Sequence, residues 1–180
     1  MGGLSRIAVA YLPPPGREIF SGATVGEELA FGSEGLMLAS GNLVTKEECL
    51  LRQRFEPIVQ RSVWELSSAE RRLLLLTSQA ALKPGLWLCD EPLACLDGSM
   101  RMKVLGFLAG CSRSGATVLA ASAEPAALAS IADNFVVLGD DGCVKMVLDG
   151  NGLPENDAGI TERPASLWFT GIVRNRKSEV

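Results

Sequence analysis

The chain has 180 residues, which suits one domain with a hydrophobic core. Apolar residues make up 47% of the sequence and charged residues 21%, as in ordinary soluble globular proteins. Because the net charge is −4, no basic surplus indicates binding to nucleic acid or to an anionic membrane surface. The longest apolar stretch is interrupted by Lys83, Pro84 and polar residues, so we predict no membrane-spanning helix.

The composition also limits the chemistry that the side chains offer. The five cysteines form no Cys-x-x-Cys pair, and we interpret them as buried, reduced thiols of a cytosolic protein. The sequence contains no histidine, which removes the commonest general base and the commonest zinc ligand. The N-terminus shows no basic segment followed by a long apolar run, so we predict no signal peptide and a cytoplasmic location.

The first half of the chain predicts one strand and two helices. A strand is expected over residues 6–13, where apolar residues alternate before a proline run, and a Gly-rich region follows. Residues 46–60 have helical composition, with Pro57 near the end of the helix. The strongest helix prediction covers residues 66–82, and the sequence Lys-Pro-Gly at 83–85 ends it.

The second half predicts strands that alternate with helices. Residues 85–92 form a short apolar run that is typical of a buried parallel strand. A helix over 99–111, a strand over 116–122 and a short helix over 125–132 follow. In residues 135–148 an Asp-Gly pair separates two apolar runs, which predicts a hairpin. The alternation favours a parallel α/β sheet.

Two adjacent acids, Asp90 and Glu91, end the predicted strand at 85–92. In phosphate-loop enzymes the first carboxylate of such a pair binds the water shell of Mg²⁺, and the second polarises the attacking water. Taken alone, the pair is more simply interpreted as a solvated strand end. Its significance therefore depends on the segments around it.

Those segments stand in a recognisable order. About twenty residues upstream of the acids is LSSAERR at 66–72, and Leu96 and Asp97 follow five residues after Glu91. This order resembles the signature motif, the Walker B motif and the D-loop of ABC-transporter ATPases, whose signature reads Leu-Ser-Gly-Gly-Gln. The stretch LWLCDEPLACLD is close to the Walker B and D-loop pattern of that family.

The resemblance covers roughly residues 6 to 150. Residues 18–32 are similar to the segment after the Q-loop, especially in the cobalt and energy-coupling-factor group, and 115–142 are similar to the switch-loop strand and the strand pair beyond it. It implies an α/β fold with the parallel sheet of the P-loop NTPase type, lacking the N-terminal part and ending in a β-hairpin. We predict residues 1–150 as a partial ABC-type ATPase domain. Residues 151–180 are predicted as a linker and an apolar segment that packs on this domain or on a partner.

Several residues with which the family binds ATP have no counterpart in the sequence. None of the five lysines follows a glycine, so the phosphate-loop motif G-x-x-x-x-G-K-[ST] is absent. Pro13 stands near the expected Q-loop glutamine, and Ala123 stands at the expected switch histidine. In the signature, Ser68 and Ala69 replace two glycines that allow close approach to a phosphate. Glu70 replaces glutamine and would place a carboxylate near phosphate oxygens.

The same residues have simpler structural interpretations. Ser67 and Glu70 fit a capping box at the start of the helix, which we prefer to contact with a phosphate. The alternative is that Ser67, Ser68, Ala69 and Glu70 face a nucleotide held by a partner chain. We expect Asp97 to cap the next helix rather than to couple two sites. We also expect Arg71 and Arg72 to lie on a solvated helix face, and Leu73–Leu76 and Leu82 to lie in the core.

The favoured function is a non-hydrolytic ABC-ATPase-like subunit that acts by contacts with a transport ATPase or a transporter membrane subunit, or by self-association, and needs no cofactor of its own. It would reach the inner membrane only through such a partner. The alternative is a composite site, in which this chain adds its signature and Walker B to Mg-ATP held by another chain. Glu91 would then be catalytic, Asp90 would serve Mg²⁺, and Asp97 would act as the D-loop residue. A third possibility is a truncated product without function.

The missing phosphate-loop strand would leave a gap in the sheet. In the family this strand lies between the strands that match residues 116–122 and 135–138. An open gap would expose unpaired backbone groups, so direct closure, a second chain or the apolar island at 166–173 must fill it. We favour the island, or self-association through it.

Overall fold

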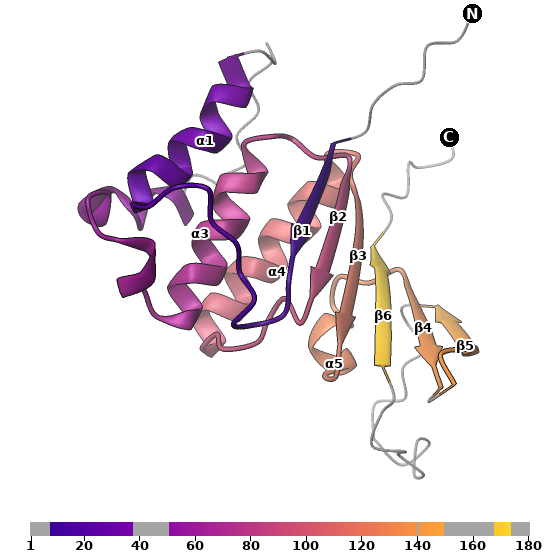
Figure 1. The fold of residues 1–180 in the computed structure, drawn as a ribbon. Helices are drawn as coiled ribbons and strands as arrows, with labels where there is room; N and C mark the ends of the chain where they lie inside the picture. The colour runs from indigo at the N-terminus through magenta and orange to yellow at the C-terminus, as the bar shows by residue number, and fades with distance from the viewer. Residues whose placement is uncertain (1–7, 38–50, 140, 150–167, 174–180) are drawn as a thin grey trace, which may run out of the picture.

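A six-stranded sheet with helices on one face makes up the part of the chain that the computed structural model describes, residues 8–37, 51–139, 141–149 and 168–173 (Figure 1). No helix within these ranges is long and apolar enough to cross a membrane. The elements in chain order are β1 (Val9–Leu12), α1 (Val25–Met37), the 3-10 turns η1 (Glu56–Ile58) and η2 (Val63–Glu65), α3 (Ser68–Ala80), β2 (Leu86–Asp90), α4 (Gly98–Arg113), β3 (Thr117–Ser122), α5 (Pro125–Leu128), β4 (Asn134–Leu138), β5 (Val144–Asp149) and β6 (Trp168–Val173).

The strands follow the order β1-β2-β3-β6-β4-β5. The first three are parallel, with Tyr11 opposite Leu88 and Leu88 opposite Leu119. β4 and β5 form an antiparallel hairpin. The α/β prediction is therefore confirmed, with a three-stranded parallel part and a two-stranded hairpin. The predicted turn includes Asp140, which lies outside the described residues.

β6 occupies the place between β3 and β4 (Figure 1). It runs antiparallel to both neighbours, with Ile172 opposite Leu119 on one side and Thr170 opposite Val136 on the other. Of the three ways to fill the gap, the structure shows the C-terminal island. The domain boundary near residue 150 stays a prediction.

The core lies between the sheet and the helices α3 and α4. Alternate strand residues such as Leu12, Trp87 and Val118 are buried against these helices, and Trp87 meets Phe107 of α4 edge to face with ring centroids 5.3 Å apart. Leu73–Leu76 are all buried, as predicted. Leu82 is 43% exposed, so its predicted burial is wrong. It lies two residues beyond the end of α3, where the chain turns and no longer follows the buried face of the helix.

The edge of the sheet at β1 is closed by a side chain from α3. The amide nitrogen of Gln79 donates to the carbonyl of Tyr11 at 2.8 Å, and its amide oxygen accepts from the backbone amide of Tyr11 at 2.7 Å. One side chain thus satisfies both backbone groups that Tyr11 presents at the edge, where they would otherwise pair with another chain.

Helix α1 falls in the Gly-rich region where the sequence led us to expect no element. Thr24 and Glu27 form a reciprocal cap, because the Thr24 hydroxyl accepts from the Glu27 amide at 3.2 Å and the Glu27 carboxylate accepts from the Thr24 amide at 3.1 Å. Glu28 is buried, and its carboxylate accepts from the amides of Ser21 and Gly22 and from the hydroxyl of Ser78 in α3. This carboxylate therefore fixes α1 against α3.

Candidate functional site

The two acids predicted from the sequence lie at the carboxyl end of β2. Asp90 is the last residue of the strand, and Glu91 adopts a left-handed backbone conformation with φ of 50°. Its amide donates to the carbonyl of Ala121 at 2.8 Å, so the pairing with β3 continues one residue beyond the strand. A left-handed residue other than glycine costs on the order of 1 kcal/mol, which the surrounding contacts must offset.

The carboxylate of Glu91 is bound by the segment that follows β3. One oxygen accepts from the backbone amide of Ala123 at 2.7 Å, and the other accepts from the hydroxyl of Ser122 at 3.1 Å. Ala123 is the residue that the sequence analysis expects at the position of the switch histidine, and this assignment stays a prediction. Ala123 meets Glu91 through its backbone, and the carboxylate is directed toward the end of β3.

The side chain of Arg72 binds the backbone of Asp90 and Glu91. It is fully buried, and its guanidinium donates to the carbonyls of Pro13 at 3.0 Å, of Asp90 at 2.9 Å, and of Glu91. The prediction that Arg72 lies on a solvated helix face is wrong. A signal was available, because Arg72 shares a helix face with Leu75 and Leu76, which follow at the spacing of neighbours in a helix.

Glu18 is the acidic partner of Arg72, and sequence reasoning did not identify it. Its side chain is 3% exposed, and one oxygen lies 3.8 Å from Arg72 Nη1. The other oxygen accepts from the amide of Gly16 at 3.0 Å. Burial lowers the pKa of Arg72, and the carboxylate of Glu18 acts against that shift. Glu18 Oε1 and Arg72 Nε make no hydrogen bond, so the pair is incompletely satisfied.

The signature-like residues form the predicted capping box at the start of α3. The Ser67 hydroxyl accepts from the Glu70 amide at 3.2 Å, and the Glu70 carboxylate accepts from the Ser67 amide at 2.9 Å and from its hydroxyl at 2.8 Å. These bonds, first from the backbone and then from the side chain of Ser67, lower the pKa of Glu70. Ser68 and Ala69 fill the first turn of the helix. Contact of these residues with a nucleotide stays a prediction.

Asp97 and Asp90 occur in contrasting settings. Asp97 caps α4 by accepting from the Met100 amide at 2.9 Å, which confirms the expected cap, while its role as a D-loop residue stays a prediction. The carboxylate of Asp90 is half-buried and makes no hydrogen bond or ion pair within the described residues. Within the same residues, no group of three potential metal ligands comes together.

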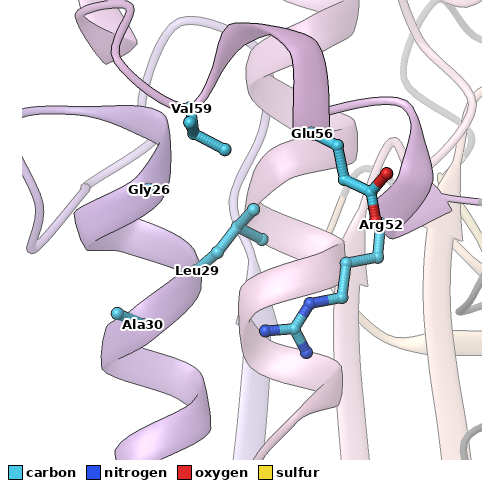
Figure 2. Close-up of a pocket in the computed structure, with 6 residues that line it drawn as sticks. All are labelled: Gly26, Leu29, Ala30, Arg52, Glu56 and Val59. Atoms are coloured by element: carbon cyan, nitrogen blue, oxygen red, sulfur yellow. The ribbon is translucent and has the colours of Figure 1, made fainter.

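A separate pocket of about 250 Å³ lies beside α1 (Figure 2). Figure 2 shows Arg52 and Glu56 across from Leu29, with Val59 above it. The amide of Gly26 donates to the carbonyl of Val59 at 2.8 Å, and a Cβ on Gly26 would meet that oxygen at 3.1 Å. The glycine therefore allows the close approach that forms one wall of the pocket.

Comparison with known proteins finds sequence similarity to ATP-binding proteins of transporters. No family model matches the chain. It is 30% identical over 126 residues to an energy-coupling factor transporter ATP-binding protein of Symbiobacterium thermophilum, an alignment that covers 69% of this chain and 43% of that protein. It is 30% identical over 123 residues to a molybdenum import ATP-binding protein of Aromatoleum aromaticum, covering 68% of this chain and 32% of that protein.

Solved structures agree with the sequence relatives on the fold. An ATP-binding subunit of an ABC transporter matches with a TM-score of 0.63 and 22% identity, over 88% of this chain and 64% of that one. A dimeric ATP-binding cassette in a post-hydrolysis state, bound to ADP and Pi, matches with a TM-score of 0.62 and 17% identity, over 82% and 65%. This chain is homologous to ABC-transporter ATP-binding domains. It spans about a third to a half of the curated relatives it matches.

In the structure the residues predicted for the site lie in two places. At the carboxyl edge of the sheet Glu91 binds Ser122 and Ala123, and Asp90 pairs with Ala121. The capping-box residues and Asp97 lie at the starts of α3 and α4, and Arg72 connects the first of these helices to the acids. Sequence reasoning missed Arg72, Glu18 and Ser122 as members of the site. Ser122 carries no pattern that distinguishes it from other strand-end serines.

Proposed function

We propose that this chain is an ABC-transporter ATP-binding-protein-like subunit that does not hydrolyse ATP alone and acts through contacts with a transport ATPase or a transporter membrane subunit. The principal support is the setting of Glu91. Both of its carboxylate oxygens accept hydrogen bonds from the residues after β3, so the side chain is held against the protein. A carboxylate that polarises water must lie within hydrogen-bond reach of that water, whereas both oxygens of Glu91 are here engaged by the protein.

The fit of Mg-ATP to the site also supports this proposal. Magnesium in nucleotide sites is held by one or two carboxylates together with phosphate oxygens. The Asp90 carboxylate makes no hydrogen bond among the described residues, its charge acts on Arg72, and it fits that part. The sequence has no Gly-Lys pair to hold the phosphates, so the remaining ligands would have to come from elsewhere.

The composite site is the second candidate, and one observation favours it. α3 has 13 residues, and the amides of Ser68 and Ala69 at its N-terminus make no hydrogen bond within the described part of the chain. Free amides at a helix start bind anions. Glu70 acts against this use, because its carboxylate already accepts from the Ser67 amide at the same helix start.

Isothermal titration calorimetry with Mg-ATP tests the main proposal. The isolated chain should show no heat of binding at micromolar nucleotide, while the Symbiobacterium thermophilum relative serves as a positive control. The Glu91→Gln variant should behave like the unchanged chain. Micromolar affinity for the isolated chain, or nucleotide trapping by Glu91→Gln, would contradict the proposal.

Co-purification separates the two candidates. The chain is co-expressed with the full-length ATP-binding protein encoded nearest to it, and the complex is isolated with and without Mg-ATP. A complex that forms equally in both conditions supports contact without nucleotide. A complex that requires Mg-ATP, and that Ser68→Glu abolishes, supports the composite site.

A further inference from the structure

The outer strand of the hairpin, β5, leaves one edge of the sheet unpaired among the described residues. It pairs with β4 alone, and Figure 1 shows it at the far side of the sheet from α1, α3 and α4. At the opposite edge, the Gln79 side chain binds the backbone of Tyr11, but no described side chain does this for β5. An edge of this kind presents backbone donors and acceptors to another strand.

The side chains of β5 place one charge near each end of this edge. Lys145, Val147 and Asp149 lie on one face of the strand, because side chains alternate along it, and all three are exposed. The register with β4 shifts between Val137 and Leu138, so the regular part of β5 begins next to Lys145. Val147 is therefore the middle residue of the segment that can extend the sheet, and a cation and an anion flank it symmetrically.

This spacing selects one way for two copies of β5 to pair. Facing residues of an antiparallel pair direct their backbone groups alike, so two identical strands related by a twofold axis always centre on one residue that faces its own copy. Centres at Lys145 or Asp149 bring like charges together. Centres at Met146 or Leu148 set one of the charges opposite Val147. Only the centre at Val147 sets Lys145 opposite the partner's Asp149, and it does so twice.

The charges also favour a second copy of β5 over an unrelated strand. A lysine on an edge strand normally opposes pairing, and only an acid directly opposite turns it into a favourable contact. Lys145 Nζ lies 2.7 Å from Asp141 Oδ2 in the turn, and both side chains are about half exposed. Exposed ion pairs contribute little, so sharing Lys145 with another acid costs little. The carboxylate of Asp149 makes no hydrogen bond or ion pair among the described residues.

We propose that β5 is a self-association edge, at which two copies of this chain pair antiparallel about Val147 and form one continuous sheet. Five facing residues span about 17 Å of an edge about 10 Å deep, far less than the roughly 800 Å² per partner of a standard interface. The dimer is therefore weak, with a dissociation constant on the order of 100 µM, and the chain is monomeric at low micromolar concentration. The pairing needs no nucleotide and does not rest on the proposed function.

Sedimentation velocity of the full chain without nucleotide tests the edge. From about 5 to about 500 µM, the sedimentation coefficient should rise from that of a monomer toward that of a dimer. Lys145→Glu sets two acids opposite each other on both sides of the axis and should weaken association at least about fivefold. Lys103→Glu on the exposed surface of α4 makes the same change in net charge and should leave association unchanged. Circular dichroism verifies that each variant folds.

A mixture of two charge variants separates pairing from a structural defect. Asp149→Lys should weaken self-association as Lys145→Glu does, because each variant alone then carries only like charges at the two positions. An equimolar mixture of the two variants should associate about as strongly as the unchanged chain, since each strand then faces one of opposite charge. A defect in the fold of either variant would not be repaired by mixing.

Three results would overturn the proposal. The first is a chain that stays monomeric up to about 500 µM, well above the expected dissociation constant. The second is a dimer that Lys145→Glu leaves intact, or that Lys103→Glu weakens equally, because association would then use another surface or depend on net charge alone. The third is a mixture of folded Lys145→Glu and Asp149→Lys chains that does not associate.

Discussion

The parallel strands and the β4–β5 hairpin differ in what they pack against. β1, β2 and β3 are parallel and have one buried face, where Val118 and Ala120 are almost inaccessible. β5 lies at the other edge and is exposed along nearly its whole length, with Val147 63% exposed. Between them, β6 joins the two parts from a distant position in the chain. The parallel part is thus stabilised by helix packing, whereas the hairpin depends on β6 for its attachment to the rest of the sheet.

We expect the largest effect on folding when the hairpin loses its attachment through β6. Deleting residues 165–180 removes β6 and leaves the facing edges of β3 and β4 unpaired. We expect aggregation, or loss of a cooperative transition in thermal unfolding followed by circular dichroism. Deleting residues 174–180 alone is the control and should preserve the transition. A 165–180 deletion that stays monomeric with unchanged melting would show that β6 contributes nothing to the sheet.

The second effect tests the parallel part through Arg72. Arg72→Met leaves the buried carboxylate of Glu18 without its cation, which should lower the free energy of unfolding by about 3–5 kcal/mol. Urea denaturation measures the change. The double variant Arg72→Met with Glu18→Gln should recover part of the loss, since the uncompensated charge is then gone. If the single and double variants were equally unstable, the three carbonyl contacts would outweigh the ion pair.

A third and smaller effect concerns the start of α3. Ser67→Ala removes the cap and should destabilise the chain by about 1 kcal/mol near neutral pH, as seen in urea denaturation. The backbone amide and then the hydroxyl of residue 67 lower the pKa of Glu70 in the folded chain, and Ser67→Ala removes only the hydroxyl bond. The contribution of that bond is present above the ordinary value of 4.5 and is lost as the pH falls through the lowered one. The difference between the variant and the unchanged chain should therefore shrink in acid. A difference that stays constant down to pH 2 would exclude the linkage.

The smallest effect is expected in the exposed hairpin. Val147→Thr in β5 replaces a side chain that is mostly in solvent by one of the same shape and of comparable preference for strands. The free energy of unfolding should change by less than about 0.5 kcal/mol. Val118→Thr is the matched change in the buried part, and it should cost markedly more because a hydroxyl enters the core. Equal effects at both positions would remove the contrast between the two parts of the sheet.

Local pattern accounts for what could be predicted from the sequence. The patterns that predict β2, β3, α3 and the hairpin of β4 and β5 each lie within a few residues, and the structure confirms these elements. Helix α1 was missed because glycines masked the Thr24–Glu27 cap. Arg72 was misplaced because a charge indicates a surface position on average, and only its carbonyl partners from two distant strand ends explain its burial. Those partners are set by the assembled sheet, which no local pattern contains.

The buried Arg72 also bears on how the chain assembles. Its acceptors come from Pro13, 59 residues before it, and from Asp90, 18 residues after it. The buried guanidinium makes these hydrogen bonds only when the ends of β1 and β2 are both in place. If either strand shifted its register by one residue, the guanidinium would lose one of its carbonyl acceptors and would be buried with fewer hydrogen bonds. The buried Arg72 therefore favours the observed alignment of β1 and β2 over alignments shifted by one residue.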